Sequence, residues 1–287
     1  MRLNSPARPF SVPPCLIAAR VGGEDAERYV VPTDEGRAAI REAAEKLIRG
    51  GPTRRAEAGT LAALAGFEII DVVEIPSAVL LCEEESRRRG GGAYLFRPGT
   101  TSRLLVQAPH THFDEGTLPL ACDLFQRMGA AALFIDTAHR YWAAQANADS
   151  KHPADVAHAQ GSLFQAATEG ALHASDKPAT VVQLHGFRPR ATGATVVVSS
   201  GERKPGDALV RGVQAGLRAV VGGGVLRFPE ETTELGATTN VQGQLARRSG
   251  CRFLHVEIES QLRHDLLADA DLRARFLDAL ATALEAP

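Results

Sequence analysis

The stretch GTLPLACDLFQRMGAAALFIDT (116–137) indicates the fold class, because a helix pattern runs directly into a strand pattern. Apolar residues in LPLACDLFQRMGA recur at helical spacing, whereas ALFIDT is a short apolar run typical of a buried strand. Farther along, SLFQAATEGALHA and DALVRGVQAGL read as helices, with the strands ATVVQLH and ATVVVSS between them. Strands recurring between helices predict an α/β fold, expected to be a three-layer sandwich with a mixed central β-sheet.

The pattern can be followed outward from this stretch to both ends of the chain. VPTDEGRAAIREAAEKLIRGG predicts a helix that begins near Thr33 or Asp34 and stops at the pair Gly50 and Gly51. GTLAALAGFEII predicts a further short helix, and SAVLLCEE, GAYLFRP and SRLLVQAP predict neighbouring strands. FLHVEIE predicts a late strand and DLRARFLDALATALE a closing helix. We therefore expect a single domain over residues 1–287, in which residues 1–100 are the least recognisable part.

Composition and charge exclude several classes of partner. The 287 residues are 44% hydrophobic, and 32 basic and 34 acidic side chains give a net charge of −2, so no charge excess indicates nucleic acid or an anionic membrane. No apolar run reaches the ~20 residues that span a bilayer. The four cysteines are far apart and form no CxxC pair, which predicts thiols rather than disulfides. We expect a cytoplasmic protein, with a secreted form left open; the sequence does not indicate an oligomeric state.

Polar side chains follow three of the predicted strands at the point where each strand ends. PHTHFDE follows RLLVQA, His185 closes ATVVQLH, and AHR follows ALFIDT. Open α/β sheets place their sites outside the carboxyl ends of the strands, because the loops converge there. These three clusters are therefore candidates for one common site.

A metal site is the most specific prediction for this edge of the sheet. His112 and Glu115 are three positions apart, which turns both side chains to one side if the loop enters a helical turn. An imidazole nitrogen and a carboxylate oxygen can share one Zn²⁺ at about 2.0 to 2.2 Å, with a third protein ligand leaving one position open for water. His185 is the expected third ligand, because it closes a strand and is followed by Gly186.

The order HFDE, then VVQLHG, then FLHVEIE resembles the His-x-x-Glu, distant His, distant Glu order of the zinc carboxypeptidase superfamily, including its aspartoacylase and N-formylglutamate amidohydrolase relatives. The resemblance covers Arg103 to about Arg263 and implies a phosphorylase/hydrolase-like fold. It implies that His112, Glu115 and His185 hold zinc and that Glu257 is the general base and acid. FIDTAHRY is similar to the segment of N-formylglutamate amidohydrolases that carries an arginine, here Arg140.

The resemblance and the residue chemistry together predict a zinc-dependent hydrolase. Its expected substrate is a small peptide or N-acyl amino acid with a carboxylate, cleaved at an amide bond by metal-activated water. Glu257 stands in an apolar strand, where a charge needs a metal, a cation or a proton to compensate it. The fork of Arg140 suits a substrate carboxylate or a developing oxyanion. Arg188 and Asn240 are further candidates for substrate binding.

Two departures and two alternatives stay open at this point. The asparagine expected before the arginine is His139 here, and residues 1–100 resemble nothing specific. His110 is interpreted as a residue that supports a ligand or caps the loop, with a ligand role left open, and Asp114 as a residue that faces solvent or holds an imidazole by a hydrogen bond. In the first alternative, His110 and His112 are the His-x-His ligands of an amidohydrolase-superfamily barrel, a fold that needs about 250 residues. In the second, the chain is a metal-binding or ligand-binding relative without catalysis.

Overall fold

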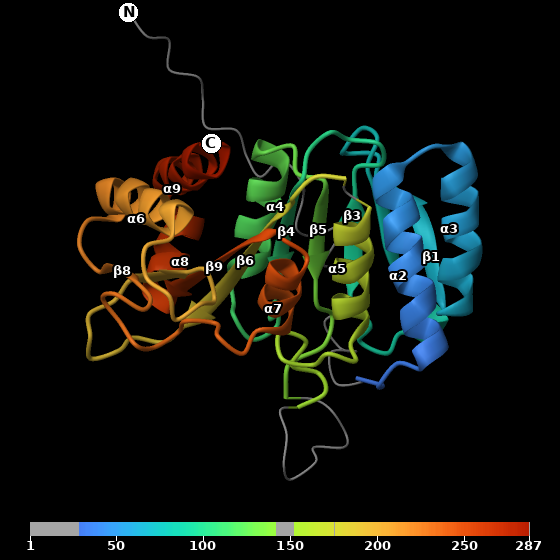
Figure 1. The fold of residues 1–287 in the computed structure, drawn as a ribbon, viewed down its shortest axis with the longest axis horizontal. Coiled ribbons are helices and arrows are strands. Elements are labelled where there is room, and N and C mark those ends of the chain that lie inside the picture. The colour runs from blue at the N-terminus through green and yellow to red at the C-terminus, as the bar shows by residue number, and fades with distance from the viewer. Residues whose placement is uncertain (1–28, 142–151, 175, 287) are drawn as a thin grey trace, which may run out of the picture.

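Nine strands form one mixed sheet at the centre of the computed structural model, which describes residues 29–141, 152–174 and 176–286 (Figure 1). The strand order is β1-β2-β3-β5-β4-β6-β9-β7-β8. The strands are β1 (Phe67–Asp71), β2 (Val79–Glu83), β3 (Ala93–Phe96), β4 (Leu104–Ala108), β5 (Ala132–Ile135), β6 (Thr180–Phe187), β7 (Val196–Ser199), β8 (Val225–Arg227) and β9 (Arg252–Glu259).

Helices cover both faces of the sheet (Figure 1). One face carries α2 (Asp34–Arg49), α3 (Pro52–Leu64), α5 (Leu163–His173) and α7 (Val241–Arg248). The other carries α4 (Thr117–Arg127), α6 (Ala208–Val221), α8 (Ser260–Ala268) and α9 (Ala270–Glu285). A short 3-10 helix, η2 (Glu85–Arg87), follows β2. The three-layer α/β arrangement with a mixed central sheet confirms the predicted fold class and excludes the closed barrel of the first alternative.

Strand direction explains where a site can form. The central strands β5, β4, β6 and β9 are parallel to one another, so their carboxyl ends meet at one edge. The outer strands β1, β2 and β3 form an antiparallel meander that joins β5, and β7 runs antiparallel to β9. In register, His185 of β6 is the Cα partner of Glu257 of β9. Two of the predicted functional residues are therefore neighbours across this pair of strands.

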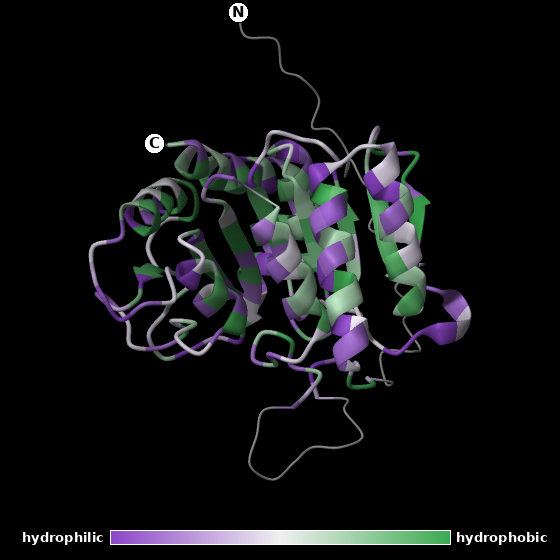
Figure 2. Ribbon diagram, turned by 45° about the vertical axis from the view of Figure 1, so that its right-hand side comes forward, coloured by the Kyte–Doolittle hydropathy of each residue, from purple (hydrophilic) through white to green (hydrophobic). Residues whose placement is uncertain are grey.

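Two hydrophobic cores lie on opposite faces of the sheet, and the side chains of each strand alternate between them. On β6, Val181 packs with the core beneath α2, α3, α5 and α7, while Val182 and Leu184 pack with the core beneath α4, α6 and α9. On β9, Phe253 packs in the core beneath α2, α3, α5 and α7, and Leu254 packs in the core beneath α4, α6 and α9. Figure 2 shows the strands predominantly hydrophobic and the helices hydrophilic on their outer sides. Both cores are thus built from residues two positions apart along each strand.

Local signals account for most of the predicted boundaries. Thr33 caps α2 through a hydrogen bond from the Gly36 N–H, and Gly50 ends it, as predicted. The segment predicted as a short helix before residue 71 is divided: α3 ends at Leu64, and β1 begins after Gly66, whose φ of 74° turns the chain. Four elements, η2, β8, α7 and α8, were not predicted. They are short, and β8 spans only three residues.

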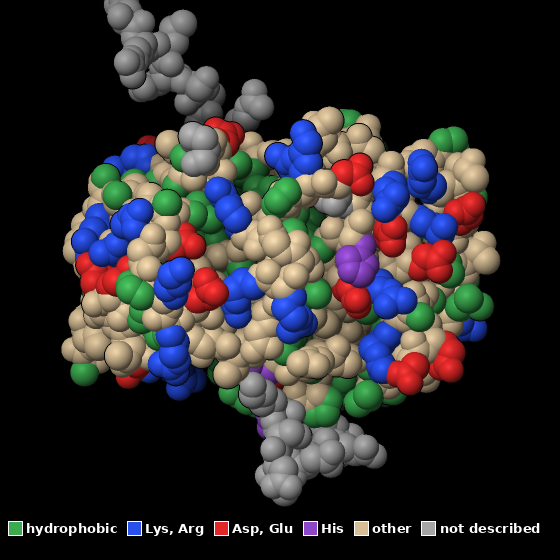
Figure 3. All heavy atoms as spheres, in the orientation of Figure 1, with side chains coloured by type: hydrophobic (Ala, Val, Ile, Leu, Met, Phe, Trp, Pro, Cys, Tyr) green, Lys and Arg blue, Asp and Glu red, His purple; other side chains and the backbone are tan. Residues whose placement is uncertain are grey.

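The surface agrees with the balanced composition. On the face seen in Figure 3, acidic and basic side chains are interspersed. Within the described part of the chain, no helix is long and apolar enough to cross a membrane. Cys82, Cys122 and Cys251 are free thiols, and Cys15 lies outside the described residues.

Candidate metal centre

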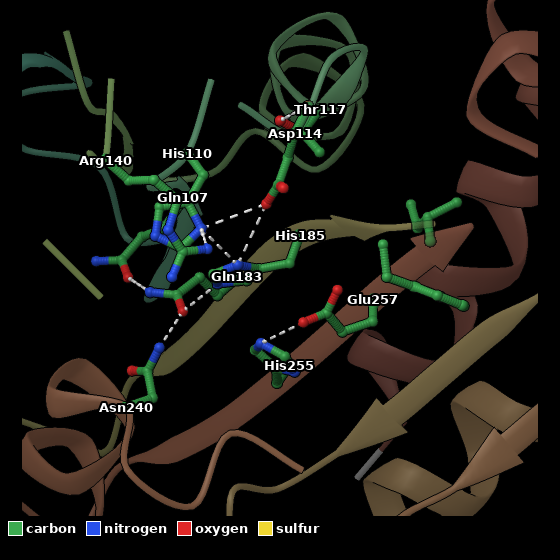
Figure 4. A network of polar contacts seen from close by, with 12 residues as sticks. Gln107, His110, Asp114, Thr117, Arg140, Gln183, His185, Asn240, His255 and Glu257 are labelled. Atoms are coloured by element: carbon green, nitrogen blue, oxygen red, sulfur yellow. Dashed lines mark hydrogen bonds and ion pairs between the residues drawn. The ribbon is translucent and has the colours of Figure 1, made fainter. Parts of the chain in front are cut away.

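Five ionisable side chains converge at the carboxyl ends of the central strands, as Figure 4 shows. His110 and Asp114 lie in the loop after β4, His185 lies near the end of β6, and His255 and Glu257 lie on β9. All five are buried, with exposed fractions between 2% and 8%. Buried ionisable side chains need a partner for each charge and each polar atom. The atoms that have no partner within the protein are therefore those that can bind a ligand.

Strand alternation supplies three of these side chains. His185 is two positions beyond Gln183, and Glu257 is two positions beyond His255, so each pair shares one face of its strand. This is the face that carries the apolar Val181 and Phe253 nearer the start of the strands. Along both strands, the side chains on this face therefore change from apolar to polar toward the carboxyl end.

A single helical turn supplies the other two. The Asp114 N–H donates to the His110 carbonyl at 2.7 Å, which closes a turn between residues four apart. Residues i and i+4 of such a turn lie on one side, so the His110 imidazole and the Asp114 carboxylate face each other. Thr117, at the start of α4, donates its hydroxyl to the Asp114 carbonyl at 2.8 Å and fixes the end of the turn.

Three ligand atoms of His110, Asp114 and His185 lie close to the spacing expected for one tetrahedral metal ion, with one of the three distances slightly shorter. The two Nδ1 atoms are 3.1 Å apart, and Oδ2 of Asp114 is 3.3 Å from Nδ1 of His110 and 3.5 Å from Nδ1 of His185. Ligands at about 2.0 to 2.2 Å from a tetrahedral Zn²⁺ are separated by roughly 3.3 to 3.6 Å. These residues can therefore hold a metal ion with little rearrangement.

The outer nitrogen of each imidazole is already engaged, and this leaves the facing nitrogens free of hydrogen. Nε2 of His110 lies 2.9 Å from Oδ1 of Asp155, and Nε2 of His185 lies 2.8 Å from Oε1 of Gln183. Both acceptors require an N–H, so in the neutral rings each Nδ1 keeps its lone pair. Oδ2 of Asp114 is buried without a hydrogen-bond partner. Three lone-pair atoms turned toward one point suit a cation.

The electrostatics of the site favour a positive charge at this point. Burial lowers the pKa of His110, but the neighbouring Asp114 and Asp155 carboxylates outweigh it, and the pKa is raised above its usual value. Burial also lowers the pKa of His185, to about 4. The two histidines hold the pKa of Asp114 well below its usual range, against the opposing effect of burial. A carboxylate and a neutral imidazole are the ligand forms that zinc requires.

Glu257 and His255 lie beside these three residues. Burial and then the nearby Asp114 raise the pKa of Glu257 well above its usual value, and its Oε2 atom is buried without a hydrogen-bond partner. Oε1 of Glu257 is 3.7 Å from Nε2 of His255, and the rings of His255 and His185 are 4.5 Å apart. His185, His255 and Glu257 form a second group that could hold a metal ion, and it shares His185 with the first.

Arg140 follows β5 and points into the same region (Figure 4). Its Nη1 lies 3.3 Å from Nδ1 of His110, and its Nη2 forms an ion pair with Asp155. The guanidinium also lies 5.3 Å from the ring centroids of Phe113 and Tyr141, within the range of a cation–π contact. With 18% of its side chain exposed, Arg140 is less buried than the ligand residues beside it.

The structure brings some of the predicted residues together and leaves others apart. His185, Glu257 and Arg140 lie in the cluster, whereas His112 and Glu115 form no ligand group with His185 among the described residues. The reason is the register of the turn, which pairs position 110 with position 114. Glu115 is exposed, and its carbonyl accepts a hydrogen bond from Nε of Arg263 at 2.6 Å. His112 is half-buried, and burial lowers its pKa.

The two predicted substrate contacts also lie outside the ligand group. Arg188 is exposed, beyond the end of β6. Asn240 is 2% exposed, caps α7 by accepting from the Gly243 N–H at 2.9 Å, and donates its amide to Gln183. Its hydrogen-bonding groups are therefore directed into the protein rather than toward a substrate.

Sequence reasoning gave Asp155, His255 and Gln183 no role at the site. Asp155 lies 45 residues from His110, so no short motif connects them. A signal did exist for the other two: the alternating patterns Q-L-H at 183–185 and H-V-E at 255–257 place polar pairs on one face of a buried strand.

Comparison with known proteins gives structural neighbours but no sequence match. No family model and no curated protein sequence matches the chain. A metallo-carboxypeptidase from Burkholderia cenocepacia is 15% identical, with 74% of this chain and 66% of that chain covered and a TM-score of 0.44. An N-formylglutamate amidohydrolase from Ralstonia eutropha JMP134 is 15% identical, with 68% and 97% covered and a TM-score of 0.43.

A bacteriophage poly-gamma-glutamate hydrolase is 16% identical, with 64% of this chain and 84% of that chain covered and a TM-score of 0.42. The carboxypeptidase and amidohydrolase names are those of the enzymes that the sequence motifs resemble. At these TM-scores the neighbours assign no function to this chain, so a functional proposal has to come from the geometry of its own site.

Proposed function

We propose that His110, Asp114 and His185 bind a zinc ion and that the chain is a zinc-dependent hydrolase. One observation carries the proposal: three buried lone-pair atoms, two Nδ1 and one Oδ2, lie 3.1 to 3.5 Å from one another. Without a bound cation, the His110 ring would have to take up a second proton to keep these atoms together in a site that excludes water. Two imidazoles and one carboxylate are also the donor set of several catalytic zinc sites.

Zinc bound in such a three-ligand site supplies the Lewis acidity that activates water and polarises a carbonyl group. Glu257 provides the base that the reaction needs. Its Oε2 atom has no hydrogen-bond partner, and its raised pKa suits a carboxylate that accepts a proton from the attacking water and passes it to the leaving amine. Placing this carboxyl on the strand next to His185 keeps it beside the ligands without requiring it to bind the metal.

Arg140 supports a substrate that carries a carboxylate. Its guanidinium is held by Asp155 and lies at the partly exposed edge of the ligand group. A planar fork with several N–H donors binds a carboxylate in two-point fashion. We therefore propose hydrolysis of an amide bond in a small peptide or an N-acyl amino acid, with Arg140 binding the substrate carboxylate.

Two pairs of variants test the metal site against the earlier prediction. His110→Ala and Asp114→Asn should lower the zinc content of the purified protein well below one ion per chain. His112→Ala and Glu115→Gln, two and one positions away, should leave it unchanged. Metal content by elemental analysis and turnover of N-acyl amino acids and short peptides are measured for all four. If zinc follows His112 and Glu115 instead, the ligand assignment is overturned; zinc without turnover of any substrate would indicate a binding protein.

A further inference from the structure

Six buried polar side chains form a connected network behind His185, on the side away from the metal ligands. They are Gln107, Gln165, Thr168, Gln183, Asn240 and Gln242, each at most 8% exposed. Amides in a protein interior are unfavourable unless each donor and acceptor is paired. In each hydrogen bond of this network, one group must therefore be the donor and the other the acceptor. Gln183 lies at the centre of the network (Figure 4).

The backbone fixes the direction of the network at one end. The Phe164 carbonyl can only accept, so the Thr168 hydroxyl donates to it at 2.8 Å. Thr168 is then an acceptor for Nε2 of Gln107, at 2.9 Å. This turns Oε1 of Gln107 toward Nε2 of Gln183, at 2.9 Å. From this end, Gln183 must direct its NH₂ group toward Gln107.

A second backbone group fixes the other end in the same sense. The Gly243 N–H can only donate, so Oδ1 of Asn240 accepts from it at 2.9 Å. The NH₂ group of Asn240 then lies 2.5 Å from Oε1 of Gln183. Both ends of the network therefore require the carbonyl oxygen of Gln183 to lie on the side of Asn240 and His185.

This oxygen determines which nitrogen of His185 carries the hydrogen. Oε1 of Gln183 lies 2.8 Å from Nε2 of His185 and can only accept. We infer that Gln183 is a positioning residue: it holds His185 in the Nε2–H tautomer and so presents the bare Nδ1 to the metal. The part of the inference that concerns the metal rests on the proposed zinc site, whereas the tautomer does not.

Two variants of Gln183 separate this role from packing. Gln183→Met has a similar length but no acceptor, so His185 should lose its tautomer preference and zinc affinity should fall about 10- to 100-fold. Gln183→Glu keeps an oxygen beside His185 and Asn240 while losing the donor to Gln107. It should retain the tautomer and most of the zinc affinity.

Gln242 provides a matched control within the same network. It accepts from Nε2 of Gln183 at 3.2 Å and donates to the Val156 carbonyl at 2.9 Å. Because its hydrogen bonds go to residues other than His185, Gln242→Met should lower stability while leaving both the His185 tautomer and the zinc affinity of the folded protein unchanged.

The experiment uses ¹⁵N NMR of the histidine rings in the zinc-free full-length chain, followed by zinc titration against a competing chelator. A wild-type His185 with hydrogen on Nδ1 would overturn the inference, and so would equal tautomers and zinc affinities in wild type and Gln183→Met. If the tautomer depends on Gln183 but the wild-type protein binds no zinc, the proposed zinc site fails while the tautomer inference stands. The two proposals can thus fail separately.

Discussion

The two faces of β6 and β9 differ in what their side chains do, although their residues alternate along the same strands. On the face beneath α4, α6 and α9, Val182, Leu184, Leu254, Val256 and Ile258 pack as an apolar core along the whole length of the strands. On the other face, the carboxyl-terminal positions carry the polar set Gln183, His185, His255 and Glu257. One face of this strand pair packs as apolar core, and the end of the other carries side chains of the proposed site.

This comparison shows how two strands can carry buried polar side chains on one face and still pack stably on the other. His255 and Glu257 are each flanked in sequence by apolar residues that pack in the opposite core, and His185 follows Leu184 of the same core. The strands are therefore held in place by the face that has no role in binding. Changes on the two faces should consequently have separable effects, on turnover and metal affinity in one case and on folding in the other.

The largest effect is expected from the polar face, at the proposed base. Glu257→Gln should lower turnover by about 10²- to 10⁴-fold, because the amide cannot accept the proton from water. Zinc content should stay at the wild-type level, since Glu257 is not a proposed ligand. Turnover and metal content are measured on the same preparation.

Glu259→Gln is the matched control for this change. The Glu259 carboxylate caps α8 by accepting from the Gln261 and Leu262 N–H groups at 2.9 and 3.2 Å. The control should lose about 1 kcal/mol of stability and keep its turnover. Full activity in Glu257→Gln would show that this carboxyl is not the base.

On the apolar face, Leu254→Ala should lower the free energy of unfolding by about 2 to 5 kcal/mol. Leu254 is fully buried in the core beneath α4, α6 and α9, so its truncation leaves a cavity there. Denaturant unfolding measures the loss, and zinc affinity of the folded fraction should match the wild type. A large drop in that affinity would show that the two faces are not independent.

A smaller effect is expected at Asp155, which orients His110 and Arg140. Asp155→Asn should weaken zinc binding about 10- to 100-fold, because an amide oxygen holds the His110 N–H more weakly than a carboxylate and the NH₂ group can turn toward the ring instead. Chelator competition gives the affinity. Asp123→Asn is the control, since Asp123 pairs with Arg273 at 3.1 Å on the other side of the sheet. If both variants bind zinc equally well, Asp155 has no special relation to the site.

The smallest change in zinc affinity is expected when the pH is lowered. Zinc needs Nδ1 of both imidazoles free of hydrogen, and the pKa of His110 is raised while that of His185 is lowered to about 4. Affinity should therefore be constant above the pKa of His110. Below it, affinity should fall about tenfold per pH unit, and more steeply below the pKa of His185. Titrations at several pH values measure the slope, and a flat profile would argue against imidazole ligands.

The sequence predicted the fold well because its signals there are local. The caps of α2 at Thr33 and Gly50 and the apolar runs of β6 and β9 each depend on neighbouring residues. The same locality placed His185 near the end of one strand and Glu257 within a late strand, where the structure has them.

The sequence did not show which residues of the loop after β4 face the proposed metal site. The pair at 112 and 115 and the pair at 110 and 114 both satisfy the spacing of one helical turn. What selects between them is the hydrogen bond from the Asp114 N–H to the His110 carbonyl, together with a contact from Arg263, 148 residues away, to the Glu115 carbonyl. Asp155 was missed for the same reason, because its contact with His110 depends on the folded arrangement of β4 and a distant loop.

His185 belongs to both candidate ligand groups. This shared residue limits how many metal ions the two groups can bind at the same time. A neutral imidazole has one lone pair, so the ring can complete either the group with His110 and Asp114 or the group with His255 and Glu257. A binuclear centre would require stripping the ring of its last proton and breaking the bond to Gln183. We therefore expect one equivalent of zinc to saturate the proposed site.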